Sequence, residues 1–141
     1  MIDIENIVTD TLIDFMSVAY PSADVTNEYT EAPASFPHIC VEQEVNAVYQ
    51  KTLDNVLHEH HAEIVFIINV YSASLTEKKA ECKKIASLVD DCMSGMKLTR
   101  TMCEPVPNAD TRVYRMTMRY RGIVEQGHIV GDKTVYQIYR S

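Results

Sequence analysis

Strict alternation of side-chain character over residues 111–124 is the feature that most constrains the fold. One parity is apolar or aromatic and the other is polar and mostly basic: Tyr114, Met116, Met118 and Tyr120 against Arg115, Thr117, Arg119 and Arg121. Successive side chains of a strand point to opposite faces of a sheet. The pattern therefore predicts a long strand with one face on a core and the other in water.

Two further stretches have the period of strands. Over residues 58–72 apolar side chains come to fill both parities, which is typical of a central strand buried on both sides. From His38 onward one parity is apolar and the other mostly polar, with Ile39, Val41 and Val45 pointing one way and Cys40, Glu42, Glu44 and Asn46 the other. This predicts a second strand with one wet face.

Two segments have helical periodicity. Residues 3–19 repeat apolar or small side chains at helical spacing and stop before Pro21, and the predicted buried stripe is Ile4, Ile7, Val8, Thr11, Phe15 and Ala19. Ser74 and Glu77 have the spacing of a capping box, so a second helix is expected over residues 76–96, with Gly95 helping it to stop. Its predicted buried face is Cys82, Ile85, Leu88, Val89, Cys92 and Met96.

The remaining segments complete an α+β order. Residues 21–37 form a long connection rich in proline, and the polar stretch 46–61 is expected to project as an arm. A strand should end at Pro105, and a last strand should follow a turn at Gly131-Asp132. We expect a single domain, 1–141, with a mostly antiparallel sheet and two helices packed on one face.

Composition argues against several classes of protein. Four glycines leave no G-x-G-x-x-G or Walker-type phosphate loop, and no apolar run is long enough to cross a membrane. The acidic N-terminus lacks the pattern of a signal peptide, and the four cysteines form no C-x-x-C pair. We therefore expect a cytoplasmic protein with reduced thiols, without a membrane partner or a cofactor.

The run His58-Glu59-His60-His61 raises the question of a metal enzyme. A zinc protease needs H-E-x-x-H on a helix, whereas histidine spacings of two and one on a strand divide the imidazoles between two faces. His38 or His128 would have to supply further ligands. A solvated strand end is the favoured interpretation and a metal site the alternative. Without a nucleophile motif either, we expect no catalytic, cofactor-binding or metal residues.

Charge is distributed unevenly along the chain. The net charge is -7, made of -11 over residues 1–75 and +4 over residues 76–141. The two halves can neutralise each other within one sheet or meet in a head-to-tail contact between copies. The same alternatives apply to the stripe of Arg115, Arg119 and Arg121 facing the acids Glu42 and Glu44. Nucleic-acid binding is disfavoured, because the tyrosines lie on the opposite face from the arginines.

Four runs carry a resemblance to a known family: EIVFIINVYS, KKAECKKIASLVDD, TRTMCEPVPN and VYRMTMRYRG. Over residues 36–125 the chain resembles the tail terminator, or tail completion, proteins of long-tailed bacteriophages and prophages. The resemblance implies an α+β fold that forms a ring, usually hexameric, on the last turn of the tail tube. Such a ring ends tube polymerisation and offers a surface to the head connector or stopper.

The resemblance also implies partners and a location. The partners are other copies of the chain, the tail tube protein and the connector, and DNA passes through the channel without specific binding. The location is the neck of the virion, after assembly in the host cytoplasm. Residues expected at the subunit or tube interface are Arg115, Arg119, Arg121, Glu42, Glu44, His58 and His60. The alternatives are another head–tail junction protein, such as a stopper or minor capsid component, and less favourably a small metal-dependent enzyme.

Overall fold

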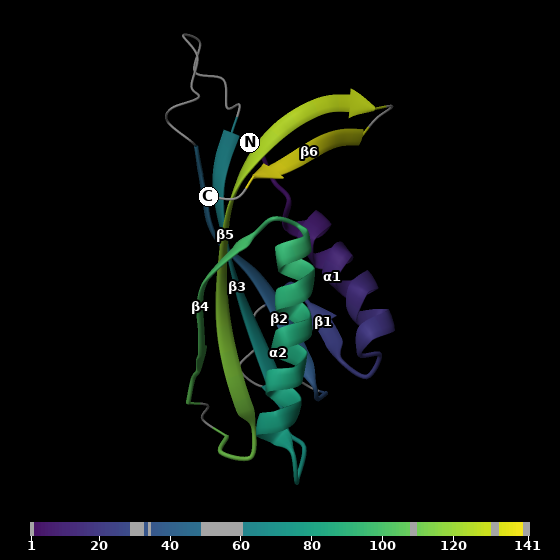
Figure 1. Cartoon of the computed structure of the whole chain (residues 1–141), viewed down its shortest axis with the longest axis vertical. Coiled ribbons are helices and arrows are strands. Elements are labelled where there is room, and N and C mark those ends of the chain that lie inside the picture. The colour runs from purple at the N-terminus through teal and green to yellow at the C-terminus, as the bar shows by residue number, and fades with distance from the viewer. Residues whose placement is uncertain are drawn as a thin grey trace.

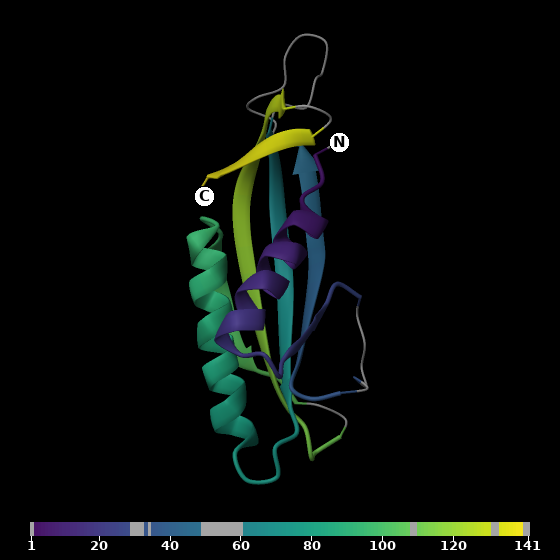
Figure 2. The same ribbon diagram turned by 90° about the vertical axis from the view of Figure 1, so that its right-hand side faces the viewer.

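The computed structural model describes residues 2–28, 33, 35–48, 61–107, 110–130 and 133–139. A six-stranded sheet carries two helices on one of its faces, and both helices lie on the same side (Figures 1 and 2). In chain order the elements are α1 Glu5–Ala19, β1 Asp24–Thr26, β2 His38–Val48, β3 His61–Ser72, α2 Lys78–Gly95, β4 Thr99–Pro105, β5 Tyr114–Val130 and β6 Lys133–Tyr139. The predicted α+β class, with a mostly antiparallel sheet, is confirmed.

The sheet is built around β3. Its strands run in the order β1-β2-β3-β5-β4, and β6 also pairs with β5. Among the strand pairs that the structure describes, β1 and β2 are parallel and the others are antiparallel. The 17-residue β5 is long enough for β4 to pair with its first part, from Pro105↔Met116 to Thr99↔Arg121, and β6 with its second, from Ile123↔Tyr139 onward. Gly122 lies at the junction between these two partners.

The core lies between the sheet and the two helices. Met116, Met118 and Tyr120 of β5 are buried there, as the alternation predicts. On α2 the buried face matches the prediction at Cys82, Ile85, Val89 and Cys92, and it adds Ala86 and Met93. Leu88 and Met96 are only partly buried at its border.

The buried stripe predicted for α1 was partly wrong. Ile7 is 45% exposed, and Thr11 and Ala19 are also exposed, whereas Leu12 and Met16 are fully buried. The core-facing side is Ile4, Val8, Leu12 and Met16, one residue every four positions. Both stripes are compatible with helical spacing, so periodicity alone did not choose between them.

Strand β2 contains a β-bulge that corrects two predicted orientations. The register shifts between Gln43 and Val45, so that Val45 pairs with Val65 on the face away from the helices. Asn46 pairs with Ile64 on the helix side, where its amide donates a hydrogen bond to the carbonyl of Ile2 at 2.6 Å. An extra residue in one strand reverses the parity of all that follows it.

Two predicted loop segments also need correction. The connection 21–37 contains β1, which pairs with β2 and places Val25 against the core. Three residues are too few to show a period. Residues 46–48 of the predicted arm belong to β2 and His61 to β3, while 49–60 lie outside the described residues. The turn at Gly131-Asp132 lies outside them too.

The ends of α2 differ in detail from the prediction. The hydroxyl of Ser74 accepts a hydrogen bond from the backbone N–H of Glu77 at 3.3 Å, and the helix begins one residue later. Gly95 is the last helical residue, but the left-handed residue beyond the helix is Lys97, with φ 65°. The backbone N–H groups of Lys97 and Leu98 donate to the carbonyls of Ser94 and Met93, at 2.9 and 3.1 Å. This is a Schellman closure with lysine at the position that favours glycine.

Candidate interaction surfaces

The face of the sheet away from the helices carries the predicted arginine stripe. Arg119 of β5 reaches across β3 to Glu44 of β2, with Nη2 2.5 Å from Oε2. The bulge makes this contact possible, because it leaves Glu44 as the extra residue of β2. Arg121 forms an ion pair with Glu63 of β3, with Nε 2.9 Å from Oε1.

Arg115 is held by a different set of partners. Its Nε donates to Oδ1 of Asn69 at 3.1 Å, and the same oxygen accepts a hydrogen bond from the Thr117 hydroxyl at 2.7 Å. Its guanidinium also lies 5.6 Å from the centre of the Tyr71 ring. Each arginine of the stripe therefore has partners within its own sheet.

These contacts bear on the two alternatives for the arginine stripe, which were pairing with acids across the sheet and pairing with another copy. Arg119 and Glu44 do pair across the sheet, whereas Glu42 has no ion pair among the described residues. A role for the arginines at a subunit boundary stays a prediction. The other two residues expected at that interface, His58 and His60, lie outside the described residues.

The tyrosines of β5 lie on the helix side, as predicted. The hydroxyl of Tyr120 donates to Oδ1 of Asp90 on α2 at 2.7 Å, and Arg100 of β4 approaches the other oxygen of that carboxylate at 3.2 Å. Burial, and then the hydrogen bond to Asp90, raise the pKa of Tyr120 far above its usual value. This contact joins β5 to α2 and keeps the Tyr120 ring on the opposite face of the sheet from the arginines.

The histidine run is only partly visible. His61 is the first residue of β3, and its Nε2 lies 3.9 Å from Oε1 of Glu125. The hydroxyl of Tyr139 donates to Oε2 of Glu125 at 2.6 Å, which raises the pKa of Tyr139. Within the described ranges no three His, Cys, Asp or Glu side chains converge as a metal site requires. The rest of the run lies outside those ranges, so the metal-site alternative stays a prediction.

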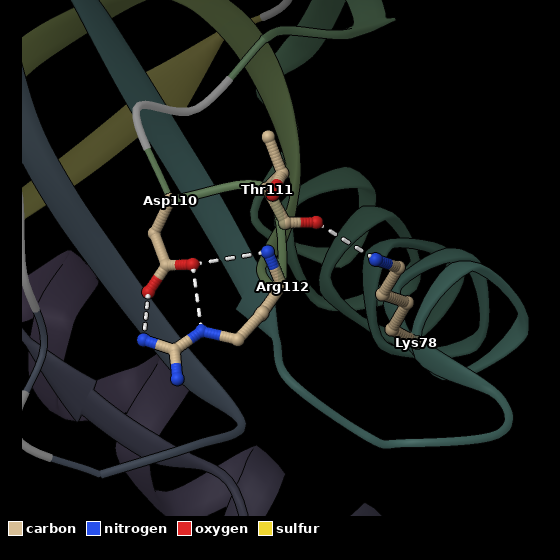
Figure 3. Close-up of polar contacts among 4 residues, drawn as sticks. All are labelled: Lys78, Asp110, Thr111 and Arg112. Carbon is tan, nitrogen blue, oxygen red and sulfur yellow. Dashed lines mark hydrogen bonds and ion pairs between the residues drawn. The ribbon is translucent and has the colours of Figure 1, made fainter.

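The loop between β4 and β5 is tied to the start of α2 (Figure 3). The ammonium of Lys78 donates to the carbonyl of Thr111 at 2.9 Å. The carboxylate of Asp110 accepts three hydrogen bonds from Arg112, one from its backbone N–H at 3.0 Å and two from its guanidinium at 3.1 Å. These hydrogen bonds lower the pKa of Asp110. The polar groups of this tip are thus satisfied locally.

Two other surfaces carry charged side chains that have no ion-pair partner among the described residues. The acidic surface is the outward stripe of α1, formed by Ile7, Asp10, Asp14 and Val18, all exposed. The basic surface lies at the start of α2 and is formed by Leu75, Lys79 and Lys83, which together line a shallow pocket. In the part of the chain that the structure describes, none of these four charged side chains has an ion-pair partner. We did not predict either surface from the sequence, although α1 has acids at three positions, Glu5, Asp10 and Asp14, and no base.

Comparison with known proteins does not assign the chain to a class. No protein-family model matches it, and no curated protein matches it in sequence. Neither described helix combines the length and apolarity that a bilayer crossing requires.

Proposed function

We propose that this protein is a structural tail protein of the terminator class, whose copies form a ring that caps the tail tube, ends its polymerisation and joins tail to head. The observation that carries the proposal is where the four resembling runs lie. Three of them form β3, β4 and β5, which are neighbours in the sheet, and the fourth forms α2, which packs on those strands. The resemblance thus covers one contiguous unit of the fold.

The electrostatics of the chain support the same proposal. A ring around a DNA channel must let the duplex slide, and tight DNA binding comes mainly from neutralising phosphates with lysine and arginine. The chain has a net charge of -7, and the arginines of its open face already have partners in the same sheet. Such a subunit is suited to surround DNA without gripping it.

The test is to remove the gene from a phage or prophage that carries it and to image the particles. We expect tails of uncontrolled length without attached heads, and recovery of uniform tails when the gene is supplied in trans. The protein should then be found as a ring at the neck. Uniform tails that merely fail to retain heads would instead indicate a stopper, and normal particles would overturn the proposal altogether.

A further inference from the structure

We infer that copies of this chain meet head to tail, with the acidic surface of α1 on one copy against the basic surface at the start of α2 on the next. The inference deepens the proposed function, and rests on it for the expectation that the contacts close into a ring. It names the partner as a second copy of the chain, and the contact as a charged one with an apolar pair at one end.

Exposed apolar side chains mark both surfaces. Val18 is 85% exposed and Leu75 101%, the highest values among the large hydrophobic residues that the structure describes. One belongs to each surface. Single exposed apolar residues are ordinary, but Val18 shares its surface with two acids and Leu75 shares its surface with two lysines. The pocket beside Leu75 is also lined by Lys78 and by the acid Glu77, so this surface has an excess of positive charge.

The charges of the two surfaces are available for a partner. The other two lysines in the first half of α2 are already engaged: Lys78 donates a hydrogen bond to the carbonyl of Thr111, and the ammonium of Lys84 lies 5.7 Å from the centre of the Tyr20 ring. Across the described ranges, Asp10 and Asp14 have no ion pair, and neither do Lys79 and Lys83. Complementary charges on two surfaces steer association and fix its register.

The spacing of the two surfaces matches. Asp10, Asp14 and Val18 follow one another at steps of four residues, and so do Leu75, Lys79 and Lys83 in the reverse chemical order. Residues four apart lie one above the other on a helix, which aligns Asp10, Asp14 and Val18 on α1 and Lys79 and Lys83 on α2. Leu75 lies in the turn that precedes α2 and lines the same pocket as the two lysines. When the two helices run antiparallel, Asp14 faces Lys79 and Asp10 faces Lys83, and Val18 is directed towards the turn that carries Leu75.

The two surfaces lie on two different, neighbouring helices. Helix α1 packs against α2, β1 and β2, whereas α2 also packs on β3, β4 and β5 and begins at one tip of the molecule (Figure 1). Contacts between two different patches are heterologous, so each added copy leaves a patch free for the next, and such a series closes into a ring or continues as a filament.

Charge reversal on each surface tests the inference. We expect the variants D10K/D14K and K79E/K83E to lose self-association by about tenfold or more, because each then presents like charges at the contact. An equimolar mixture of the two variants should recover assembly, since every contact between unlike copies again joins acid to base. Mass in solution, measured by light scattering over a range of concentrations, gives the result. The control is Asp91→Lys, an exposed acid on the other half of α2, which should assemble like the wild type.

Four results would overturn the inference. Assembly that both variants retain, or that the mixture does not recover, would place the contact elsewhere and leave the proposed function standing. A mass that stops at two copies would exclude the head-to-tail arrangement. A wild-type chain that remains monomeric at every concentration would also refute the contact, while the tail-length experiment would decide the proposed function independently.

Discussion

At the scale of single residues, the ion pair between Arg119 and Glu44 shows how one extra residue in β2 gives a charge its partner. Both side chains are partly exposed, at 42% and 36%, so the pair should contribute at most about 1 kcal/mol to stability. Its larger effect is on register, because it links two strands that are not neighbours.

Arg119→Glu should therefore lower the free energy of unfolding by about 1 kcal/mol, since it replaces an attraction with two like charges. Adding Glu44→Arg should restore most of the loss, which urea denaturation can measure. The matched control is Glu42→Arg with Arg119→Glu, because Glu42 lies on the same strand without an ion pair in the described residues. Equal recovery by both double variants would show that general charge, and not this contact, matters.

His38 gives the protein a pH dependence that can be traced to one side chain. It is 4% exposed, its Nε2 lies 3.1 Å from the Thr26 hydroxyl, and its Nδ1 lies 3.7 Å from the Asp24 carboxylate. Burial lowers its pKa, and Asp24 only partly opposes that effect. As the pH falls, His38 therefore takes up a proton at a higher pH in the unfolded chain than in the folded chain. The free energy of unfolding should consequently fall as the pH drops below about 6.5.

His38→Gln should flatten this dependence. Urea denaturation of the wild type and the variant at several pH values between about 7.5 and 5 measures the effect. We expect the wild type to lose more stability than the variant over this range. Parallel curves would assign the dependence to other groups.

At the scale of elements, the end of α2 contains a residue in a conformation that suits glycine better. Lys97 has φ 65°, where a Cβ atom costs about 1 kcal/mol. Lys97→Gly should accordingly stabilise the protein by about 1 kcal/mol in thermal or urea unfolding. Lys97→Ala keeps the Cβ atom and should give no such gain, so equal effects of the two variants would contradict this explanation.

Gly122 allows β4 and β6 to share one edge of β5. A Cβ atom at this position would lie 2.6 Å from Cδ2 of Leu98 and 3.3 Å from Cγ2 of Ile138. Leu98 is 1% exposed and has little room to move. Gly122→Ala should thus destabilise the fold by about 1–3 kcal/mol. If the clash is with Leu98, the double variant with Leu98→Ala should lose less than the sum of the two single losses.

The accuracy of the sequence-based predictions depended on the length of each element. The face of β5 and the core side of α2 were correct, because many residues repeat one period. The bulge at Glu44 was missed because one inserted residue has no period, and the three residues of β1 were too few. On α1 two stripes were equally periodic, and only packing showed that Ile7 faces outward.

At the scale of the whole molecule, the acidic first half and the basic second half of the sequence leave some charges paired within the sheet and others unpaired on the helices. Part of it is neutralised inside the sheet, where Glu44 and Glu63 of the acidic half meet Arg119 and Arg121 of the basic half. The pairing of Arg119 with Glu44 was predictable as one of two alternatives. The unpaired surfaces on α1 and α2 were not, because exposure and the absence of a partner are properties of the folded chain.

Salt distinguishes the inferred contact from a purely apolar one. Two exposed ion pairs contribute about 0.3–1 kcal/mol each, and screening shortens from about 10 Å at 0.1 M salt to about 3 Å at 1 M. Self-association should therefore weaken by about 3- to 30-fold between low and high salt, without disappearing, because the contact of Val18 with Leu75 is apolar. Copies with a net charge of -7 also repel one another, and salt screens that repulsion too. Association that tightens with salt would mean that the overall repulsion outweighs the local pairs. The salt response should then follow net charge, weaker for the less acidic D10K/D14K and stronger for the more acidic K79E/K83E than for the wild type.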